Sequence, residues 1–342
     1  MTIKRRSFIG GSAALLGLGL YSAHRGVRIP PLVWEPSPHP RATKLGGLTL
    51  NYSGLISVTE PLNAEIGLRA YVPEPELKLS FEQPNELIIS LNNLAPAAQL
   101  LLEAPQGVTV DEQISGITRV LTIKSQTRGE VWARWQLAQP NGYRFAAIGD
   151  TGGQRELHWC IQRAYDLGAL FLLHLGDFYY TEGDYKSAID AFNSAPLPCY
   201  VSIGNHDFHD GQTVYQNFLD EIGPFNAQFN LGGVRFLNVD TASNLIPYGA
   251  GQRGAMLREA SKQAAAVNNI AFTHRPLFDP LEGSSHDIGS RGERDWLIDA
   301  LKRCQVSTLL SGHIHIHARD TVQGIDNIIA VSYTHLTLPT IA

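Results

Sequence analysis

The sequence contains little cysteine, with three residues among 342, Cys160, Cys199 and Cys304, and no two of them close together. This spacing excludes a disulfide framework and a cysteine-based zinc site. The apolar surroundings of each cysteine predict buried free thiols. The net charge is also small: 27 Lys and Arg residues and 32 Asp and Glu residues give −5. Without a dense basic stripe beyond the first few residues, we expect no nucleic-acid partner.

The apolar run near the N-terminus, from about Phe8 to Tyr21, is too short for a comfortable membrane span and fits an export signal. It follows the segment KRRSFI, whose arginine pair resembles a twin-arginine signal. We therefore assign residues 1–28 to an export signal and expect a periplasmic or extracellular protein. Because no clean A-x-A cleavage triplet follows, an uncleaved N-terminal membrane anchor stays open.

Changes of composition divide the rest of the chain. Residues 29–44 begin with the proline-rich stretch IPPLVWEPSPHP and are typical of a semi-rigid linker. Residues 45–139 contain short runs such as ELIISL and EVWARWQLA, separated by Pro, Gly and Asn, which predict a small all-β sandwich of fibronectin or immunoglobulin type. The final stretch VSYTHLTLPTIA, residues 331–342, looks like an adaptor-derived read-through tail, and we exclude it from functional reasoning.

From residue 143 to residue 330, strand-like and helix-like segments alternate, which predicts an α/β domain. Five apolar strands in this region each end in polar residues that can bind metal. Functional groups of such sheets gather beyond the carboxyl ends of the strands. The polar residues are Asp150, Asp177, the run Asn205-His206-Asp207, His274, and His313 with His315.

This combination of carboxylate, amide and imidazole groups suits first-row transition metals. One carboxylate can bridge two ions roughly 3.5–4 Å apart, the arrangement used in two-metal hydrolysis. The sequence therefore predicts a binuclear metal site that hydrolyses a phosphate ester.

The order GD, GDxxY, GNHD, H and GHxH resembles that of the calcineurin-like metallophosphoesterase superfamily, over about Tyr143 to Asp320. The resemblance implies a sandwich of two β-sheets flanked by helices. It also implies a role for each polar residue. Asp150 and His315 would bind the first metal, Asp177 would bridge, and Asn205, His274 and His313 would bind the second. His206 would contact the phosphate and protonate the leaving group, and Asp207 would orient the His206 imidazole.

One departure from the superfamily pattern is informative. Most members carry GDxH as the first motif, but Gly152 stands at the histidine position here, in GDTGG. Purple acid phosphatases are similar to this sequence in having GDxG, and they compensate with a tyrosine three residues after the bridging aspartate. Tyr180 holds that place. The resemblance implies Fe(III) in the first site and Fe(II), Zn(II) or Mn(II) in the second.

Two further residues are candidates for substrate binding. His286 lies in a loop where purple acid phosphatases have a substrate-contacting histidine, although its spacing from His274 is longer by a few residues. Arg275 could meet a phosphate oxygen bidentately. We expect a small phosphomonoester substrate, attacked by a metal-bound hydroxide. A phosphodiesterase or nucleotidase on the same scaffold and a non-catalytic metal-binding protein are the alternatives, and the oligomeric state is left open.

Overall fold

The computed structural model describes residues 42–59, 65–138, 142–207, 214–242, 249, 251–263, 266–281, 286, 288, 290–331 and 340–341. The expected export signal, most of the expected linker and most of the expected tail lie outside these residues. Within the described part of the chain, no helix is both long enough and apolar enough to cross a membrane. The three cysteines are free and buried, as their surroundings predicted.

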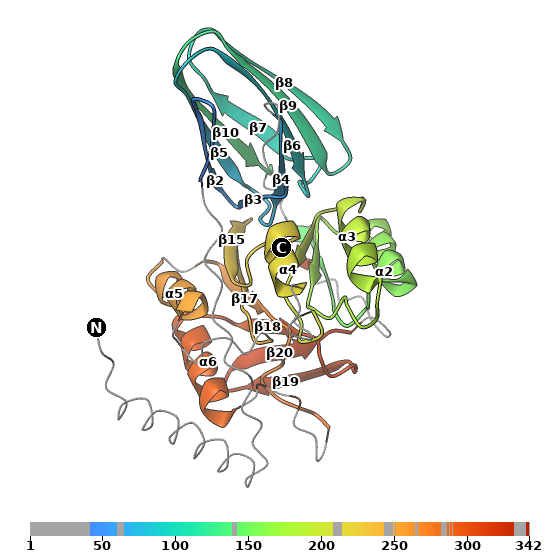
Figure 1. Ribbon diagram of the computed structural model, residues 1–342. Helices are drawn as coiled ribbons and strands as arrows, with labels where there is room; N and C mark the ends of the chain where they lie inside the picture. Colours follow the sequence, from blue (N-terminus) through green and yellow to red (C-terminus); the bar gives the residue numbers. More distant parts are fainter. Residues whose placement is uncertain are drawn as a thin grey trace, which may run out of the picture. The chain divides into compact units, whose positions relative to one another are not determined.

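The N-terminal strands form two five-stranded sheets (Figure 1). Inward and outward residues alternate along the strands, because successive side chains point to opposite faces. In β10, Val131, Ala133 and Trp135 are buried, whereas Trp132 is 38% exposed. One sheet has the order β1 (Ala42–Leu45), β2 (Leu48–Ser53), β5 (Glu76–Phe81), β10 (Gly129–Gln136), β7 (Gln99–Glu103); the other β3 (Leu55–Ser57), β4 (Glu65–Ala70), β6 (Asn85–Asn92), β9 (Thr118–Ser125), β8 (Val108–Ser115).

The second region contains a parallel sheet of three strands, β12 (Ala146–Ile148), β13 (Leu172–His174) and β14 (Cys199–Val201), in that order. All nine residues of these strands are buried, which explains their continuous apolar sequence. Because β12, β13 and β14 are parallel, their carboxyl ends meet at one edge of the sheet. A short strand, β11 (Tyr143–Arg144), pairs separately with β21 (Thr340–Ile341).

A six-stranded sheet completes this region, with four parallel strands, β16-β17-β18-β20, between two antiparallel ones, β15 and β19. Aromatic rings from both sheets interlock: Phe145 lies 5.4 Å from Phe171 and 5.3 Å from Phe236, centroid to centroid. The strands are β15 (Ala227–Leu231), β16 (Val234–Asn238), β17 (Asn268–Phe272), β18 (Thr308–Ser311), β19 (Ala318–Val322) and β20 (Ile325–Ile329).

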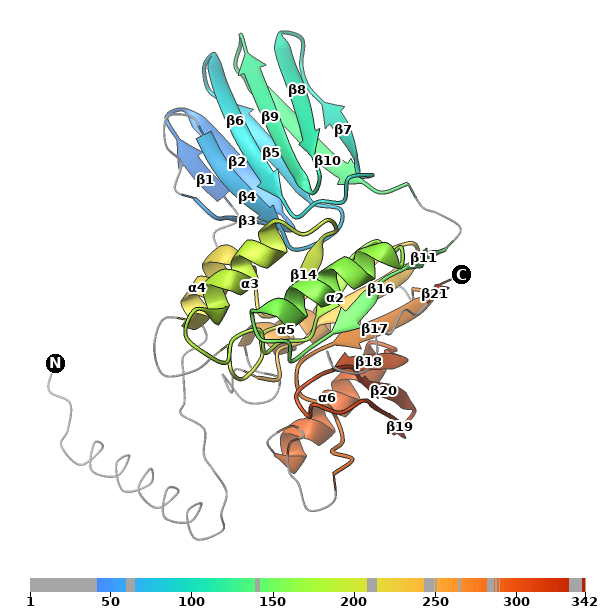
Figure 2. The same cartoon turned by 90° about the vertical axis from the view of Figure 1, so that its right-hand side faces the viewer.

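Helices cover both outer sides of the two sheets, with α2 and α3 on one side and α5 and α6 on the other (Figures 1 and 2). Helix α6 begins after Ser290, whose hydroxyl accepts a hydrogen bond from the Glu293 N–H at 3.1 Å. This arrangement is the expected sandwich of two sheets flanked by helices. The helices are α2 (Arg155–Asp166), α3 (Asp184–Asn193), α4 (Val214–Glu221), α5 (Gly251–Ala260) and α6 (Arg291–Arg303).

Candidate metal centre

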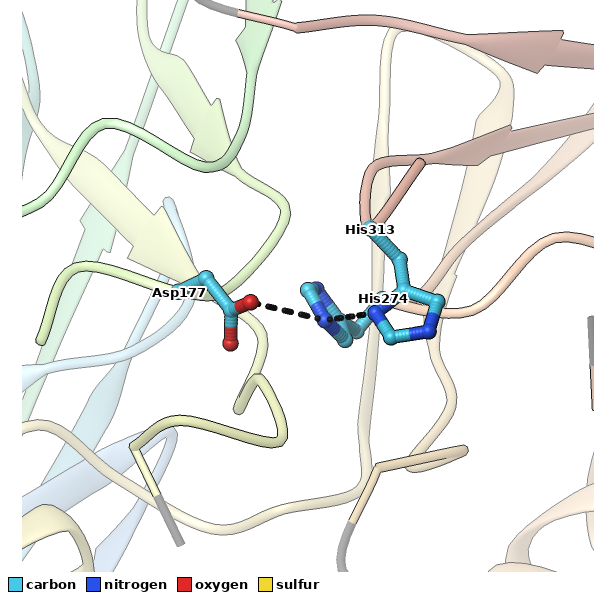
Figure 3. A group of neighbouring side chains, drawn as sticks. All are labelled: Asp177, His274 and His313. Atoms are coloured by element: carbon cyan, nitrogen blue, oxygen red, sulfur yellow. Dashed lines mark hydrogen bonds and ion pairs between the residues drawn. The ribbon is translucent and has the colours of Figure 1, made fainter. Parts of the chain in front are cut away.

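Three side-chain atoms lie close to one nitrogen of the His274 ring, which follows strand β17. Figure 3 shows two of these side chains, Asp177 and His313. His274 Nε2 lies 2.9 Å from Asn205 Oδ1, 3.1 Å from His313 Nδ1 and 3.3 Å from Asp177 Oδ2. The other ring nitrogen, Nδ1, is 2.8 Å from the Leu175 carbonyl oxygen, so it carries the proton. Nε2 then faces two oxygen acceptors and a second imidazole nitrogen, so this point requires a positive charge, carried by a proton or by a metal ion.

The same crowding explains the pKa values of this cluster. Burial opposes protonation of His274, but the Asp177 carboxylate outweighs it and raises the pKa of His274 to about 9. Burial and the neighbouring His274 lower the pKa of His313 to about 2. In the metal-free chain the shared charge is a proton on His274. A divalent or trivalent ion fits the same donor set of one carboxylate, one amide oxygen and two imidazoles.

A second group of ligand atoms uses Asp177 again. Asp150, Asp177 and His315 bring one ligand atom each within 4.8 Å of one another, as do Asp177, His274 and His313. His315 Nε2 lies 3.5 Å from Asp150 Oδ1. The Tyr180 hydroxyl is 3.2 Å from His315 Nε2 and 3.5 Å from Asp177 Oδ2. Asp177 therefore stands between two donor sets, and both sets fit a metal ion.

The candidate ligands occupy strained backbone positions. Asp150, Asp177, His313 and His315 all have φ between 58° and 75°, in the left-handed region that L residues rarely adopt. Such strain costs on the order of 1–3 kcal/mol per residue and persists where the surrounding structure holds it in place. Each turn directs its side chain from the end of a strand into the common site.

Two glycines in the motifs leave room for the carboxylates. A Cβ atom at Gly204, in GNHD, would lie 2.1 Å from Asp177 Oδ1. A Cβ atom at Gly312, in GHIH, would lie 2.4 Å from Asp150 Oδ2. The His313 N–H donates to the Asp150 carboxylate at 2.8–2.9 Å, which joins two segments that are 163 residues apart. A side chain at either glycine would exclude the ligand.

Asp207 has a structural role beyond the one expected from the sequence. It is fully buried, and its carboxylate accepts hydrogen bonds from the backbone N–H groups of Asp177, Phe178, Tyr179 and Gly204, at 2.8–3.1 Å. The Asp207 carboxylate therefore holds the turn that presents Asp177, a structural role that the sequence did not indicate. Orientation of the His206 imidazole by Asp207 stays a prediction.

His174 is a buried histidine with both ring nitrogens hydrogen-bonded, and it supports the first motif. Its Nδ1 accepts from the Gly176 N–H at 3.2 Å, so Nε2 carries the proton and donates to Thr151 Oγ1 at 2.9 Å. The Thr151 hydroxyl donates in turn to the Gly152 carbonyl at 2.6 Å. Burial lowers the pKa of His174 to about 3, so the ring is neutral. This chain connects β13 to the GDTGG turn.

The three residues proposed for substrate contact lie beside the donor sets. The His206 ring packs on the Tyr180 ring, with centroids 4.7 Å apart. The His286 ring centroid is 5.9 Å from that of His313, and its side chain is 57% exposed. Burial lowers the pKa of Arg275, while Asp177 is the foremost charge that opposes this. These three residues thus lie near the candidate ligands Tyr180, His313 and Asp177, respectively.

Two residues that the sequence did not single out contribute to the site. Asp184 accepts hydrogen bonds from the backbone of Tyr180 and from the Gln154 side chain. An aspartate four residues after the motif tyrosine, in YTEGD, was the available signal. An aspartate is also common at a helix N-terminus, and the sequence alone could not distinguish helix capping from support of Tyr180 by Asp184.

Comparisons with known proteins identify the family of the α/β region. Residues 143–317, a little over half of the chain, match the family model described as Calcineurin-like phosphoesterase. No curated protein matched the chain. Among solved structures, PhoD is similar at 11% identity over 82% of this chain and 76% of its own, with a TM-score of 0.48.

Two further solved structures are similar over a little more than half of the chain. GAP50, the anchor in the inner membrane complex of Plasmodium, shares 18% identity over 56% of this chain and 71% of its own, with a TM-score of 0.42. A dimetal phosphatase from Danio rerio shares 13% identity over 58% of this chain and 91% of its own, with a TM-score of 0.39.

Proposed function

The chain belongs to the calcineurin-like phosphoesterase family of metal-dependent hydrolases, and we propose that it is an exported phosphomonoesterase of the purple acid phosphatase type. In this proposal the first site holds Fe(III) and the second Fe(II), Zn(II) or Mn(II). When bound, the two ions supply an activated water and neutralise the charge that develops on the phosphoryl group. The protein positions the ions and the substrate.

The observation that carries the proposal is the pairing of Tyr180 with Gly152. A Cβ atom on Gly152 would lie 3.4 Å from Tyr180 Cδ2, so the tyrosine ring occupies the space that a side chain at position 152 would enter. The Tyr180 hydroxyl reaches the Asp150–Asp177–His315 group from this side. A phenolate is a hard anionic ligand that favours Fe(III).

Ionisation of Tyr180 requires a strong cation. Burial and the Asp177 and Asp150 carboxylates raise the pKa of Tyr180 above its ordinary value in the metal-free chain. A trivalent ion held by these groups would reverse that effect, because it would attract the phenolate that the carboxylates repel. We therefore assign Asp150, Asp177, Tyr180 and His315 to the first metal. Asn205, His274 and His313, with Asp177 shared, are assigned to the second.

Three residues would act on the substrate. His206, which touches the Tyr180 ring, would protonate the leaving oxygen. Arg275 and His286 would bind the phosphoryl oxygens, since a guanidinium forms charge-assisted hydrogen bonds to phosphate. A monoester dianion places more charge between these groups than a diester does, and this favours the monoester. The expected substrate is small, with no nucleic acid, and the export signal predicts a periplasmic or extracellular location.

Metal analysis combined with two chromogenic substrates tests this function. We expect about two metal ions per chain and faster hydrolysis of p-nitrophenyl phosphate than of bis-p-nitrophenyl phosphate. Faster hydrolysis of the diester would favour the phosphodiesterase alternative. If the chain binds no metal and cleaves neither ester, the proposed phosphomonoesterase activity is refuted.

The tyrosinate assignment has a separate spectroscopic test. Iron-loaded protein is expected to show a visible tyrosinate-to-Fe(III) charge-transfer band, and Tyr180→Phe should abolish it. Tyr179→Phe is the matched control and should retain the band, because Tyr179 is the adjacent tyrosine of the same turn. A colourless protein fully loaded with Mn or Zn would remove the purple acid phosphatase proposal and leave the family assignment intact.

A further inference from the structure

Asp184 is a buried carboxylate directly behind Tyr180, with an exposed fraction of 3%. Its Oδ2 accepts hydrogen bonds from the backbone N–H groups of Tyr180, at 3.1 Å, and Thr181, at 2.9 Å. Its Oδ1 accepts from Gln154 Nε2 at 2.7 Å. Burial opposes ionisation of Asp184, but these hydrogen bonds outweigh it and lower its pKa. A single charged group thus holds two turns.

The two turns that Asp184 joins are pressed together. A Cβ atom at Gly153 would lie 2.0 Å from the Asp184 carbonyl oxygen, so only glycine permits this approach. The Gly152 N–H donates to the Asp177 carbonyl at 3.1 Å. The turn after β12 and the turn after β13 are therefore held in direct contact, and Gln154 adds a hydrogen bond from the first turn to Asp184.

Helix capping is the ordinary explanation for an aspartate at the start of a helix, and the contacts of Asp184 argue against it. Asp184 is the first residue of α3, and the residue at the cap position is Gly183, which makes no side-chain cap. The N–H groups that Asp184 accepts belong to Tyr180 and Thr181, which precede the helix. The carboxylate is directed back toward the metal centre.

We propose that Asp184 is a positioning residue that fixes Tyr180 at the first metal site. The Asp184 carboxylate sets the backbone position of Tyr180, and the packing against His206 then sets the ring. The hydroxyl consequently stands 3.2 Å from His315 Nε2. This role rests on the proposed function of Tyr180 as a metal ligand, and Asp184 itself touches neither metal nor substrate.

Substitution by alanine and by asparagine separates positioning from charge. Asp184→Ala removes both acceptors, so the Tyr180 backbone is released. Asp184→Asn retains one oxygen for the two backbone N–H groups, and the Gln154 amide can turn so that its oxygen accepts from the new amide nitrogen. We therefore expect Asp184→Asn to rescue most of what Asp184→Ala loses.

The control variant is Glu74→Ala, in the β-sandwich. The Glu74 carboxylate also accepts a backbone hydrogen bond, from the Leu137 N–H at 2.9 Å. Glu74→Ala removes a carboxylate that accepts a backbone N–H, as Asp184→Ala does, but in the β-sandwich rather than in the α/β region. Any effect shared by both alanine variants is a general loss of stability.

Amide hydrogen exchange of the metal-free full chain and Mn²⁺ binding by calorimetry test the proposal together. In Asp184→Ala we expect the peptide containing Tyr180 and Thr181 to exchange at least tenfold faster and the first-site affinity for Mn²⁺ to fall at least tenfold. In iron-loaded protein the visible band should weaken or shift. Asp184→Asn should stay within about threefold of the wild type, and Glu74→Ala should change none of these readouts.

Two results would overturn the role of Asp184. One is unchanged exchange at Tyr180 and Thr181 in Asp184→Ala. The other is faster exchange with unchanged Mn²⁺ affinity and an unchanged band, which would make Asp184 merely structural. Failure of the proposed function is a different result, since a wild-type chain without any band removes the tyrosinate. In that case the exchange rates and Mn²⁺ affinities still decide whether Asp184 positions the site.

Discussion

Replacement of Asp207 by asparagine should destabilise the chain strongly, although the change removes one charge and alters no volume. Each carboxylate oxygen of Asp207 accepts two backbone N–H groups: Oδ2 those of Asp177 and Gly204, and Oδ1 those of Phe178 and Tyr179. An asparagine has one oxygen and one NH₂ group. Whichever way the amide turns, its NH₂ group faces two donors, and two buried N–H groups lose their acceptor.

The size of the effect follows from that count. An unsatisfied buried N–H costs about 1–3 kcal/mol, so two of them amount to roughly 2–6 kcal/mol. Burial and the neighbouring Asp177 raise the pKa of Asp207, and hydrogen bonds from the Gly204 and Asp177 N–H groups counteract part of that rise. At a pH above this pKa, loss of the charge adds to the effect, because hydrogen bonds to ionised groups are the stronger ones. A domain with a total stability of about 5–15 kcal/mol would lose a large part of it.

Urea unfolding of the metal-free protein measures this loss by linear extrapolation. Glu74→Gln is the matched control, because Glu74 accepts one backbone N–H and its amide can turn an oxygen toward that donor. We expect less than about 1 kcal/mol for this control. A loss below about 1 kcal/mol for Asp207→Asn as well would refute the reasoning, since it would mean that the four hydrogen bonds are not formed together.

Three further predictions concern stability and substrate binding. The pKa of His174 is lowered to about 3 in the folded chain. The unfolded chain therefore binds more protons between pH 6.5 and 3, so the free energy of unfolding decreases as the pH is lowered through that window. His174→Gln should reduce the slope by about 1.4 kcal/mol per pH unit in urea unfolding, whereas the exposed His158→Gln should not, and equal slopes would contradict a buried neutral ring. Gly153→Ala places a Cβ atom against the Asp184 carbonyl and should lower the unfolding free energy by about 1–3 kcal/mol or more; an unchanged urea midpoint would show that the two turns can separate freely. Arg275→Met should raise KM for p-nitrophenyl phosphate about tenfold or more with a smaller change in kcat, and an unchanged KM would remove Arg275 from the substrate site.

The fold class could be predicted because its signals are local. Alternation of buried and exposed residues along β10 depends on the pleat of one strand, and the short apolar runs at β12, β13 and β14 reflect burial on both faces. Helix α6 begins where Ser290 offers a cap. Each of these features involves residues only a few positions apart, so a single sequence is sufficient to show them.

The site was predictable in its residue types and less so in its interactions. Asp207 stands beside His206 in the sequence, and this adjacency suggested that it orients the imidazole. In the fold, the turn after β13 brings three N–H groups to the Asp207 carboxylate, and Gly204 after β14 brings a fourth, so this carboxylate also holds the turn that presents Asp177. The support given by Asp184 to Tyr180 was hidden for a related reason, since an aspartate before a helix has a commoner explanation.

The sequence by itself determined that Asp150, Asp177, His274 and His313 each follow an apolar strand, because hydrophobic runs and turn residues are read along the chain. Only the tertiary structure decided which of their lone pairs meet. That choice depends on the order of strands within two sheets and on left-handed turns that direct each side chain inward. The His313 N–H reaches Asp150 across 163 residues, and a contact of that range is set by packing, which no local pattern encodes.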